Sequence, residues 1–278
     1  MTVFTPAETP HPDLPSYSFD NDDPEAVDRH NYLSAMLDPT TFERLAGLGD
    51  LTGYRCLELG AGGGSVARWL AERVGPTGRV VATDLNTRHI PPHPGYTVLT
   101  HDLERDPLPE GPWDLIHARL VLLHVPRREE VLRGLADSLA PGGALVIEDW
   151  LTSVNKLVLA APDAESAALF DAFQTTMVER ILPAQGNDPG WAARVHGAML
   201  DAGLVDVDTV ISARSWPGGS PGTLIAGANI AQLRDQLFAH GFTPEQLDAL
   251  HRLVADPRLV LRSNLTYSTV GRRAKDGR

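Results

Sequence analysis

Five short apolar runs alternate with amphipathic helical segments between residues 54 and 150. The runs are RCLEL, RVVATD, YTVLTHD, WDLIHA and ALVIED, and turn sequences such as GPTG and PGG separate them from the helices. Consecutive parallel strands need long right-handed crossover connections, which helices normally provide. The pattern therefore predicts an α/β protein with a doubly wound, mostly parallel sheet that is covered by helices on both faces.

The segments on either side of this pattern extend the expected sheet. Residues 1–15 are rich in proline, and residues 23–48 predict two short helices that are separated at Asp38-Pro39. After Trp150 the sequence is mostly helical, but VDVDTVISAR and LTYSTVGRR predict a sixth and a seventh strand. Because the segment between them is longer than an ordinary connection, we expect a seven-stranded sheet with a helical insert over its edge or its ligand face.

The composition of the chain limits the kinds of molecule that it is expected to bind. The chain has 24 basic and 36 acidic residues, a formal net charge of −12, which opposes binding to nucleic acid or to anionic lipid. No apolar run is long enough to span a membrane, and the N-terminus does not resemble a secretory signal. The single Cys56 excludes an internal disulfide, and the histidines lack metal-ligand spacing. We expect a cytoplasmic protein without a metal.

The segment CLELGAGGGSVARWLAERVG joins the first expected strand to the first helix. A dinucleotide fingerprint, GxGxxG, would place a third glycine where this chain has Ser65. The glycines lie instead at Gly60, Gly62 and Gly64, with Glu58 two residues before them. This pattern resembles motif I of the class I S-adenosylmethionine (SAM)-dependent methyltransferases. A tight strand–helix turn of another doubly wound protein gives the same local signal, so further motifs are needed.

The order of the later motifs also resembles this family and implies a set of cofactor residues. Asp84 is implied to accept from the ribose hydroxyls, as in NAD enzymes, and Asp102 and the Leu103 N–H to bind adenine. Leu85 is implied to pack on adenine, with ordinary core packing as the alternative. Glu58 is implied to contact the amino group of the methionine part. The other implied cofactor residues are Gly60, Ala61, Gly62, Gly64, His117, Ala118, Arg119 and, on an N-terminal lid, Tyr17 and Arg29, for which surface placement is the alternative.

Two residues are candidates for the chemistry itself. Methyl transfer depends mainly on alignment, and a base helps when the acceptor is a hydroxyl or an acidic carbon. His124 follows the fourth expected strand, and Asp149 follows the fifth, at the edge where open α/β sheets bind ligands. A structural role is the alternative for His124, and capping of the next loop is the alternative for Asp149.

The resemblance implies a SAM-dependent methyltransferase that yields S-adenosylhomocysteine (SAH) and methylates an O, N or C atom of a small, partly apolar metabolite. It extends to the branch that includes quinone and natural-product enzymes, and we expect a monomer or homodimer. A SAM-binding cyclase or isomerase, a SAM sensor and an NAD(P) oxidoreductase are the alternatives. We expect one continuous catalytic domain with an N-terminal arm and lid (1–50), a SAM-binding Rossmann-like core (51–150) and the remaining sheet with substrate-binding insertions (151–278).

Overall fold

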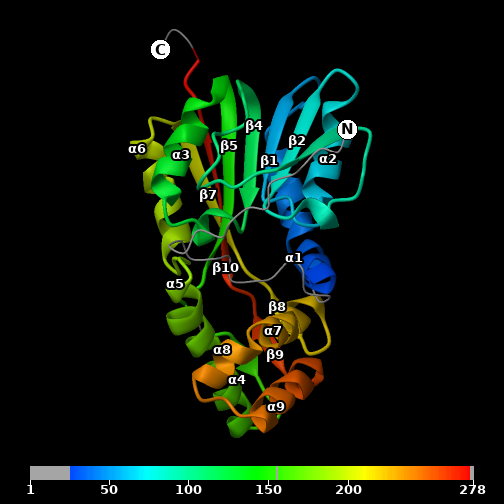
Figure 1. Ribbon diagram of the computed structural model, residues 1–278, viewed down its shortest axis with the longest axis vertical. Helices are drawn as coiled ribbons and strands as arrows, with labels where there is room; N and C mark the ends of the chain where they lie inside the picture. Colours follow the sequence, from blue (N-terminus) through cyan, green and yellow to red (C-terminus); the bar gives the residue numbers. More distant parts are fainter. Residues whose placement is uncertain (1–25, 155, 276–278) are drawn as a thin grey trace, which may run out of the picture.

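The computed structural model of the chain describes residues 26–154 and 156–275, so the expected lid residue Tyr17 lies outside the described residues. A seven-stranded sheet with the order β3-β2-β1-β4-β5-β10-β7 forms its upper half in Figure 1. Neighbouring strands from β3 to β5 are parallel, whereas β10 is antiparallel to both β5 and β7. The strands are β1 (Arg55–Leu59), β2 (Arg79–Asp84), β3 (Tyr96–Thr100), β4 (Trp113–Arg119), β5 (Leu139–Leu151), β7 (Val205–Ser212) and β10 (Leu265–Arg272).

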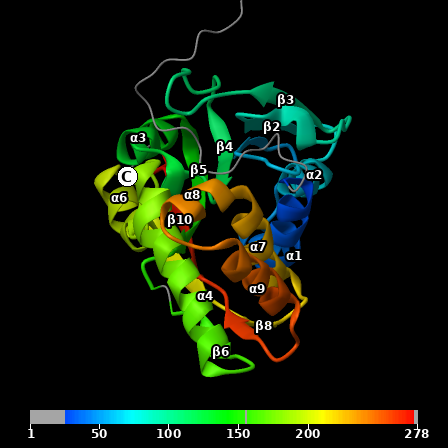
Figure 2. The same cartoon turned by 60° about the horizontal axis from the view of Figure 1, so that its bottom comes forward.

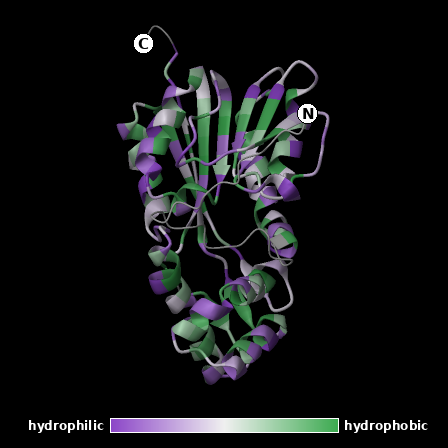
Figure 3. Cartoon of the chain, in the orientation of Figure 1, coloured by the Kyte–Doolittle hydropathy of each residue, from purple (hydrophilic) through white to green (hydrophobic). Residues whose placement is uncertain are grey.

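Helices cover both faces of this sheet. On one face, α1 (Ala26–Ala46) and α2 (Ser65–Val74) enclose a core that includes Leu45, Cys56 and Leu70. On the other face lie α3 (Arg128–Asp137), the 3-10 turn η4 (Trp191–Arg194) and α6 (Val195–Asp201). Figure 3 shows the central strands in the hydrophobic colour and many hydrophilic positions on the outer helices. The predicted doubly wound, mostly parallel sheet of seven strands is confirmed.

The first helix differs from the expectation of two short helices. Residues 26–46 form one helix that contains Pro39, so the predicted break at this residue is wrong. Proline removes one intrahelical hydrogen bond, but packing on both sides of it holds the helix together. Met36 and Leu37 pack with Trp150 before the proline, and Leu45 is buried against the sheet after it.

Described segments between residues 156 and 262 fold into a second layer below the sheet, which we call the cap (Figures 1 and 2). Its short strands β6 (Val158–Ala160), β9 (Val260–Arg262) and β8 (Ser215–Pro217) form an antiparallel sheet in that order. Phe170, Phe173, Ile230 and Leu250 belong to its apolar core. Its helical segments are α4 (Ala164–Thr176), a π-helical turn η3 (Met177–Ile181), α5 (Leu182–Ala184), α7 (Pro221–Gln232), α8 (Arg234–Ala239) and α9 (Pro244–Ala255).

The sequence TPEQ at residues 243–246 predicts a capping box with proline at the first helical position, and α9 begins with this box. The Thr243 side chain accepts from the Gln246 N–H, and the Gln246 side chain accepts from the Thr243 N–H. None of the helices in the described part of the chain has the length and apolar character needed to cross a bilayer.

Candidate functional site

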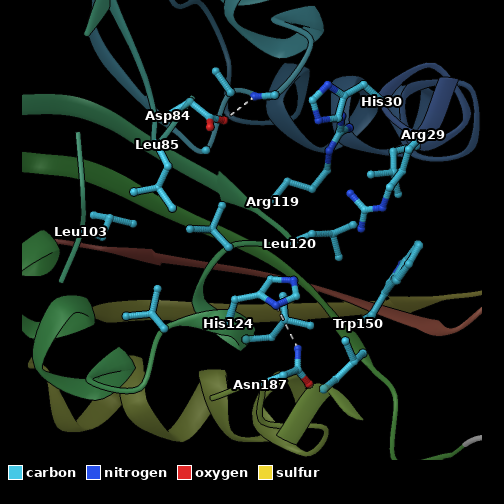
Figure 4. Close-up of a pocket in the computed structure, with 18 of the residues that line it drawn as sticks. Arg29, His30, Asp84, Leu85, Leu103, Arg119, Leu120, His124, Trp150 and Asn187 are labelled. Atoms are coloured by element: carbon cyan, nitrogen blue, oxygen red, sulfur yellow. Dashed lines mark hydrogen bonds between the residues drawn. The ribbon is translucent and has the colours of Figure 1, made fainter. Parts of the chain in front are cut away.

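A cavity of about 510 Å³ lies at the carboxyl ends of the parallel strands, between the sheet, α1 and the cap (Figure 4). Two ends of this cavity are lined by different kinds of residue. The glycine-turn end is lined by Glu58, Gly60, Ala61, Gly62, Gly63, Asp84, Leu85, Asp102 and Leu103. The cap end is lined by Leu120, Leu123, His124, Trp150, Thr152, Gln174, Met177, Val178, Leu182, Gln185, Asn187, Asn229 and Asn264.

The turn after β1 needs glycine for two different reasons. Gly60, Gly62 and Gly64 all have positive φ angles, of 61°, 54° and 76°, which L-residues with a Cβ rarely adopt. At Gly60 a Cβ would also lie 2.3 Å from Val121 Cγ2, which is a severe clash. At Gly62 the nearest atom to a Cβ is 3.6 Å away, on His30, which is an ordinary contact. Steric exclusion of a side chain is therefore strongest at Gly60.

Asp84 ends β2 with its carboxylate beside the glycine turn. Oδ2 accepts from the Gly62 N–H at 2.8 Å, drawn in Figure 4, and Oδ1 accepts from the Asn86 N–H at 3.0 Å. Burial raises the pKa of Asp84, and these backbone donors oppose the rise. Each carboxylate oxygen has a second lone pair, so the side chain can accept further hydrogen bonds from a ligand in the cavity.

Apolar side chains flank this carboxylate. Leu85 is 52% exposed and lines the cavity, so it is not an ordinary core residue. Leu103 lines the cavity as well, and Figure 4 shows both leucines on the same side of it. The neighbouring Asp102 accepts from the Glu104 N–H at 2.8 Å and lies 3.5 Å from Arg105 Nε. These residues therefore form an apolar slot with carboxylates at its rim.

A buried ionic cluster lies directly behind the glycine turn. His117 Nδ1 is 2.7 Å from Glu58 Oε2, and its Nε2 is 3.4 Å from Glu148 Oε2. Burial alone lowers the pKa of His117, but the two carboxylates outweigh it and raise the pKa to about 9. Although burial opposes the shift, the hydrogen bonds and charge of His117 help to lower the pKa of Glu148 to about 2. His117 is therefore a cation at neutral pH, held between two carboxyl groups.

Side chains of α1 extend this cluster to the start of α2. Thr41 donates to Glu148 Oε2 and accepts from Arg119 Nη1 at 2.9 Å. Arg119 Nη2 also pairs with Asp38 at 2.9 Å, and Asp38 in turn accepts from the Ser65 hydroxyl at 3.0 Å. Arg119 lines the cavity, whereas the expected cofactor residues His117 and Ala118 are fully buried and do not line it. The chain of contacts connects α1 to the glycine turn.

The first turns of α1 contribute to the cavity wall. Arg29 is 7% exposed, and its Nε donates to Asn229 on α7 at 3.2 Å. Its neighbour His30 lines the same wall, and burial, with the charge of Arg29, lowers the pKa of His30 to about 4. Figure 4 shows both side chains on the upper right of the cavity. Arg29 is therefore buried at the cavity, and the alternative that it lies on the surface is wrong.

His124, one of the two candidates for the chemistry, lies at the cavity. It ends the 3-10 turn η2 (Leu122–His124), and its Nδ1 is 3.2 Å from Asn187 Nδ2, as the lower dashed line in Figure 4 shows. Burial and the positive charges of Arg29 and Arg128 lower the pKa of His124 to about 3. The imidazole is therefore neutral at pH 7 and is a weak base.

Asp149, the other candidate, does not line the cavity. The strand β5 continues to Leu151, so Asp149 lies inside it, and its side chain is on the opposite face from Trp150, which does line the cavity. Burial raises the pKa of Asp149 to about 7, while the nearby N–H groups of Val121 and Leu123 and the Trp191 indole oppose the rise. Of the two candidates, His124 lines the cavity and Asp149 does not.

The model of a family described as "Methyltransferase domain" matches residues 28–247. The chain belongs to the class I SAM-dependent methyltransferases. It is 31% identical over 127 residues to the ubiquinone/menaquinone biosynthesis C-methyltransferase UbiE of Pseudomonas savastanoi, covering 42% of this chain and 50% of UbiE. It is 40% identical over 98 residues to methyltransferase str2 of Strobilurus tenacellus, covering 34% and 35% of the two chains. The chain spans about half or less of the length of these curated relatives.

Solved structures show the same fold. A Bacillus halodurans protein assigned as a methyltransferase superposes with a TM-score of 0.54 at 17% identity, over 84% of this chain and 98% of that one. YcgJ of Bacillus subtilis superposes with a TM-score of 0.50 at 14% identity, over 80% and 92% of the two chains. At this identity, the likeness concerns the fold alone.

Membership of this family identifies SAM as the cofactor and removes the NAD(P) alternative. The glycine-turn end fits SAM, because it offers an acceptor carboxylate on Asp84, an exposed Leu85 and a turn without side chains at Gly60 and Gly62. SAM has no phosphate, so the absence of a third glycine at Ser65 is consistent with this fit. In the described residues, no group of three or more His, Cys, Asp or Glu side chains is placed to hold a metal ion.

Proposed function

We propose that this chain transfers a methyl group from SAM to an oxygen, nitrogen or carbon atom of a small, partly apolar metabolite, as in quinone or natural-product biosynthesis. The observation that carries the proposal is the continuity of the cavity, because one space is lined by the glycine turn at one end and by the cap at the other. The similarity to UbiE, a C-methyltransferase by name, supports a carbon acceptor among the three.

The proposal assigns roles at the glycine-turn end. Asp84 accepts from the ribose hydroxyls, Asp102 binds the adenine amine, and Leu85 and Leu103 hold the adenine ring between them. Glu58 contacts the amino group of the methionine part of SAM, and His117 holds the Glu58 carboxylate in place from behind. Arg29 binds the carboxylate of the methionine part. These roles are supported by the presence of all these side chains except His117 in the lining of one cavity, and by the hydrogen-bonding chemistry of each residue type.

When bound, the cofactor supplies a methyl group on a positively charged sulfur, which is an activated electrophile. The residues of the cap end then have to hold the acceptor and exclude water. Trp150, Met177 and Leu182 offer apolar contact, and neutral His124 can hydrogen-bond the atom that is methylated. Because His124 is a weak base, positioning contributes more to the rate than removal of a proton.

The proposal is tested by incubating the full chain with SAM and a panel of small aromatic and aliphatic acceptors. We expect SAH and a methylated product to form in equal amounts, measured by mass spectrometry. If an acceptor is cyclised or isomerised while SAM is retained, the chain uses SAM without transferring its methyl group, and the cyclase alternative replaces this proposal. If SAH does not bind in calorimetry, the assignment of the glycine-turn end is wrong.

Replacing Asp84 with alanine is expected to weaken SAH binding by about 1–3 kcal/mol, because the ribose hydroxyls lose a charged acceptor. Calorimetry measures this difference. Asp50→Ala is the matched control, since Asp50 also accepts from the N–H two residues ahead, that of Thr52, but is exposed and does not line the cavity. Equal SAH affinity of the Asp84→Ala variant and the wild type would show that the ribose lies elsewhere.

A further inference from the structure

The geometry points to an acceptor that is uncharged and carries several hydroxyl, carbonyl or amide groups on an apolar body, recognised at the cap end by Gln174, Thr152 and Asn187. This inference rests on the proposed function, because it takes the cap end as the place where the acceptor binds. It goes further by fixing the charge and the hydrogen-bonding character of that acceptor.

The polar lining of the cap end consists mostly of carboxamides. Helix α4 contributes Gln174, the residue directly after α5 is Gln185, and loops contribute Asn187 and Asn264. The hydroxyl group of Thr152 follows β5 on the same wall. A carboxamide offers both a donor and an acceptor without a formal charge, and rotation about its last bond exchanges the two. This wall is therefore able to pair with neutral polar groups of either kind.

Each of these five side chains has a buried polar atom without a hydrogen-bond partner. The atoms are Gln174 Nε2, Gln185 Oε1, Asn187 Oδ1, Asn264 Oδ1 and Thr152 Oγ1. Gln174 is 3% exposed, and Thr152 and Asn187 are each 5% exposed. More than nine in ten buried polar groups in native proteins are paired, so five unpaired ones on residues that line one cavity indicate that a ligand completes them.

The charges around the cavity favour a neutral ligand at the cap end. Among the described lining residues, no aspartate, glutamate or lysine belongs to this end, and His124 is neutral at pH 7. A protonated amine would lose its water without gaining a carboxylate, which is costly in a closed site. Arg29 on the adjoining α1 wall already donates to Asn229, and we assign it to the carboxylate of the cofactor.

The apolar surfaces between these amides define the body of the acceptor. Trp150 is 9% exposed, and Met177 and Leu182 are 6% and 5% exposed, all on the cavity wall. The π-helical turn η3, which begins at Met177, lies between Gln174 and Gln185, so in this part of the lining a carboxamide stands on each side of an apolar run. A ring system with polar substituents at its edge matches that arrangement.

The test uses three naphthalene probes of similar size, with SAH at saturation and calorimetry at pH 7. The probes are 2,7-dihydroxynaphthalene, 2-naphthoate and protonated 2-(aminomethyl)naphthalene. We expect the diol to bind about tenfold more tightly than either ion, because only the diol can pair with the amides without losing the hydration of a charge. Tighter binding of either ion, or no binding of the diol, would overturn the inference.

Two substitutions separate recognition from a structural role. Gln174→Met and Thr152→Val remove a polar group with little change in volume, and each is expected to weaken diol binding about tenfold without changing the affinity for SAH. Since both side chains have an unpaired buried atom, the same variants are expected to raise the melting temperature of the ligand-free protein by about 2 °C. A residue that only supports the fold would lower both the melting temperature and the affinity.

Gln236→Met is the matched control, because Gln236 is on α8 outside the cavity lining. Its diol affinity is expected to equal that of the wild type. If Gln174→Met and Thr152→Val also bind the diol as the wild type does, the amide wall does not recognise the acceptor and the inference is wrong. SAH binding by the wild type tests the proposed function, whereas the three probes test only the acceptor. A wild type that does not bind SAH would therefore contradict the proposed function itself.

Discussion

Replacing His117 with leucine is expected to lower the free energy of unfolding at pH 7 by about 3–5 kcal/mol, because it leaves two carboxylates buried without their cation. Glu58 and Glu148 are both 2% exposed, and His117 contacts one with each ring nitrogen. Leucine fills a similar space but cannot neutralise either charge. Denaturant unfolding of the two proteins, followed by circular dichroism, measures the difference.

The same cluster predicts how stability changes with pH. The pKa of His117 is about 9 in the folded chain and 6.5 without the fold, so the folded state binds the proton more tightly. The stabilisation is therefore complete below pH 6.5 and is lost as the pH rises through 9. The unfolding free energy of the wild type is expected to fall between these values, whereas that of His117→Leu changes less.

Two further variants keep this prediction testable. In the double variant His117→Leu/Glu148→Gln one buried charge is gone, so we expect it to recover part of the lost stability even if the single variant folds poorly. His196→Leu is the control, because His196 contacts the neutral Thr209 hydroxyl at 2.9 Å, and its loss is expected to cost only about 1 kcal/mol. A similar loss for His117→Leu would show that the cluster is not ionic.

The sheet and the cofactor turn were predictable from sequence because both depend on local spacing. Alternating strands and helices restrict a chain to very few sheet topologies, and the backbone at Gly60, Gly62 and Gly64 requires glycine wherever it occurs. The capping box at Thr243 is local in the same sense. Such features involve residues that are close together in the chain, so their signal does not depend on how distant segments pair.

Features that depend on strand register were not predictable. Glu58, His117 and Glu148 meet because β1, β4 and β5 are neighbours and place these residues on one face. Nothing in the sequence near His117 indicates that it faces a carboxylate on each side rather than the cofactor. The same limit applies to Asp149, since a one-residue difference within β5 decides whether a side chain faces the cavity or the core.

The cap shows a third kind of limit. Each of its three strands has only three residues, and the strands come from segments about 50 to 100 residues apart. Strands this short show no alternation of polar and apolar residues from which they could be predicted. The unpaired atoms Gln174 Nε2 and Asn187 Oδ1 carry no sequence signal either, since isolated polar residues in a helix or loop are usually exposed. Only the packing of the cap against the sheet turns them into a cavity wall.

Replacing Gly60 with valine is expected to weaken SAH binding by at least about 100-fold, a cost of about 2.7 kcal/mol, because the cofactor turn cannot keep its shape. The φ angle of 61° is unfavourable for any β-branched residue, and the new Cβ would lie 2.3 Å from Val121 Cγ2. Either Val121 or the turn has to move, and both line the cavity. Calorimetry with SAH measures the effect.

The control for backbone strain alone is Gly203→Val. Gly203 has a φ of 79°, a Cβ added to it would meet no atom within 4 Å, and it is outside the cavity lining, so this variant is expected to lose stability but to bind SAH normally. Adding Val121→Ala to Gly60→Ala removes the atom that clashes, and should restore part of the affinity that Gly60→Ala loses. If Gly60→Val binds SAH as tightly as the wild type, contact between the turn and Val121 does not shape the cofactor site, and the fit of SAM to this turn would rest on Asp84 and Leu85 alone.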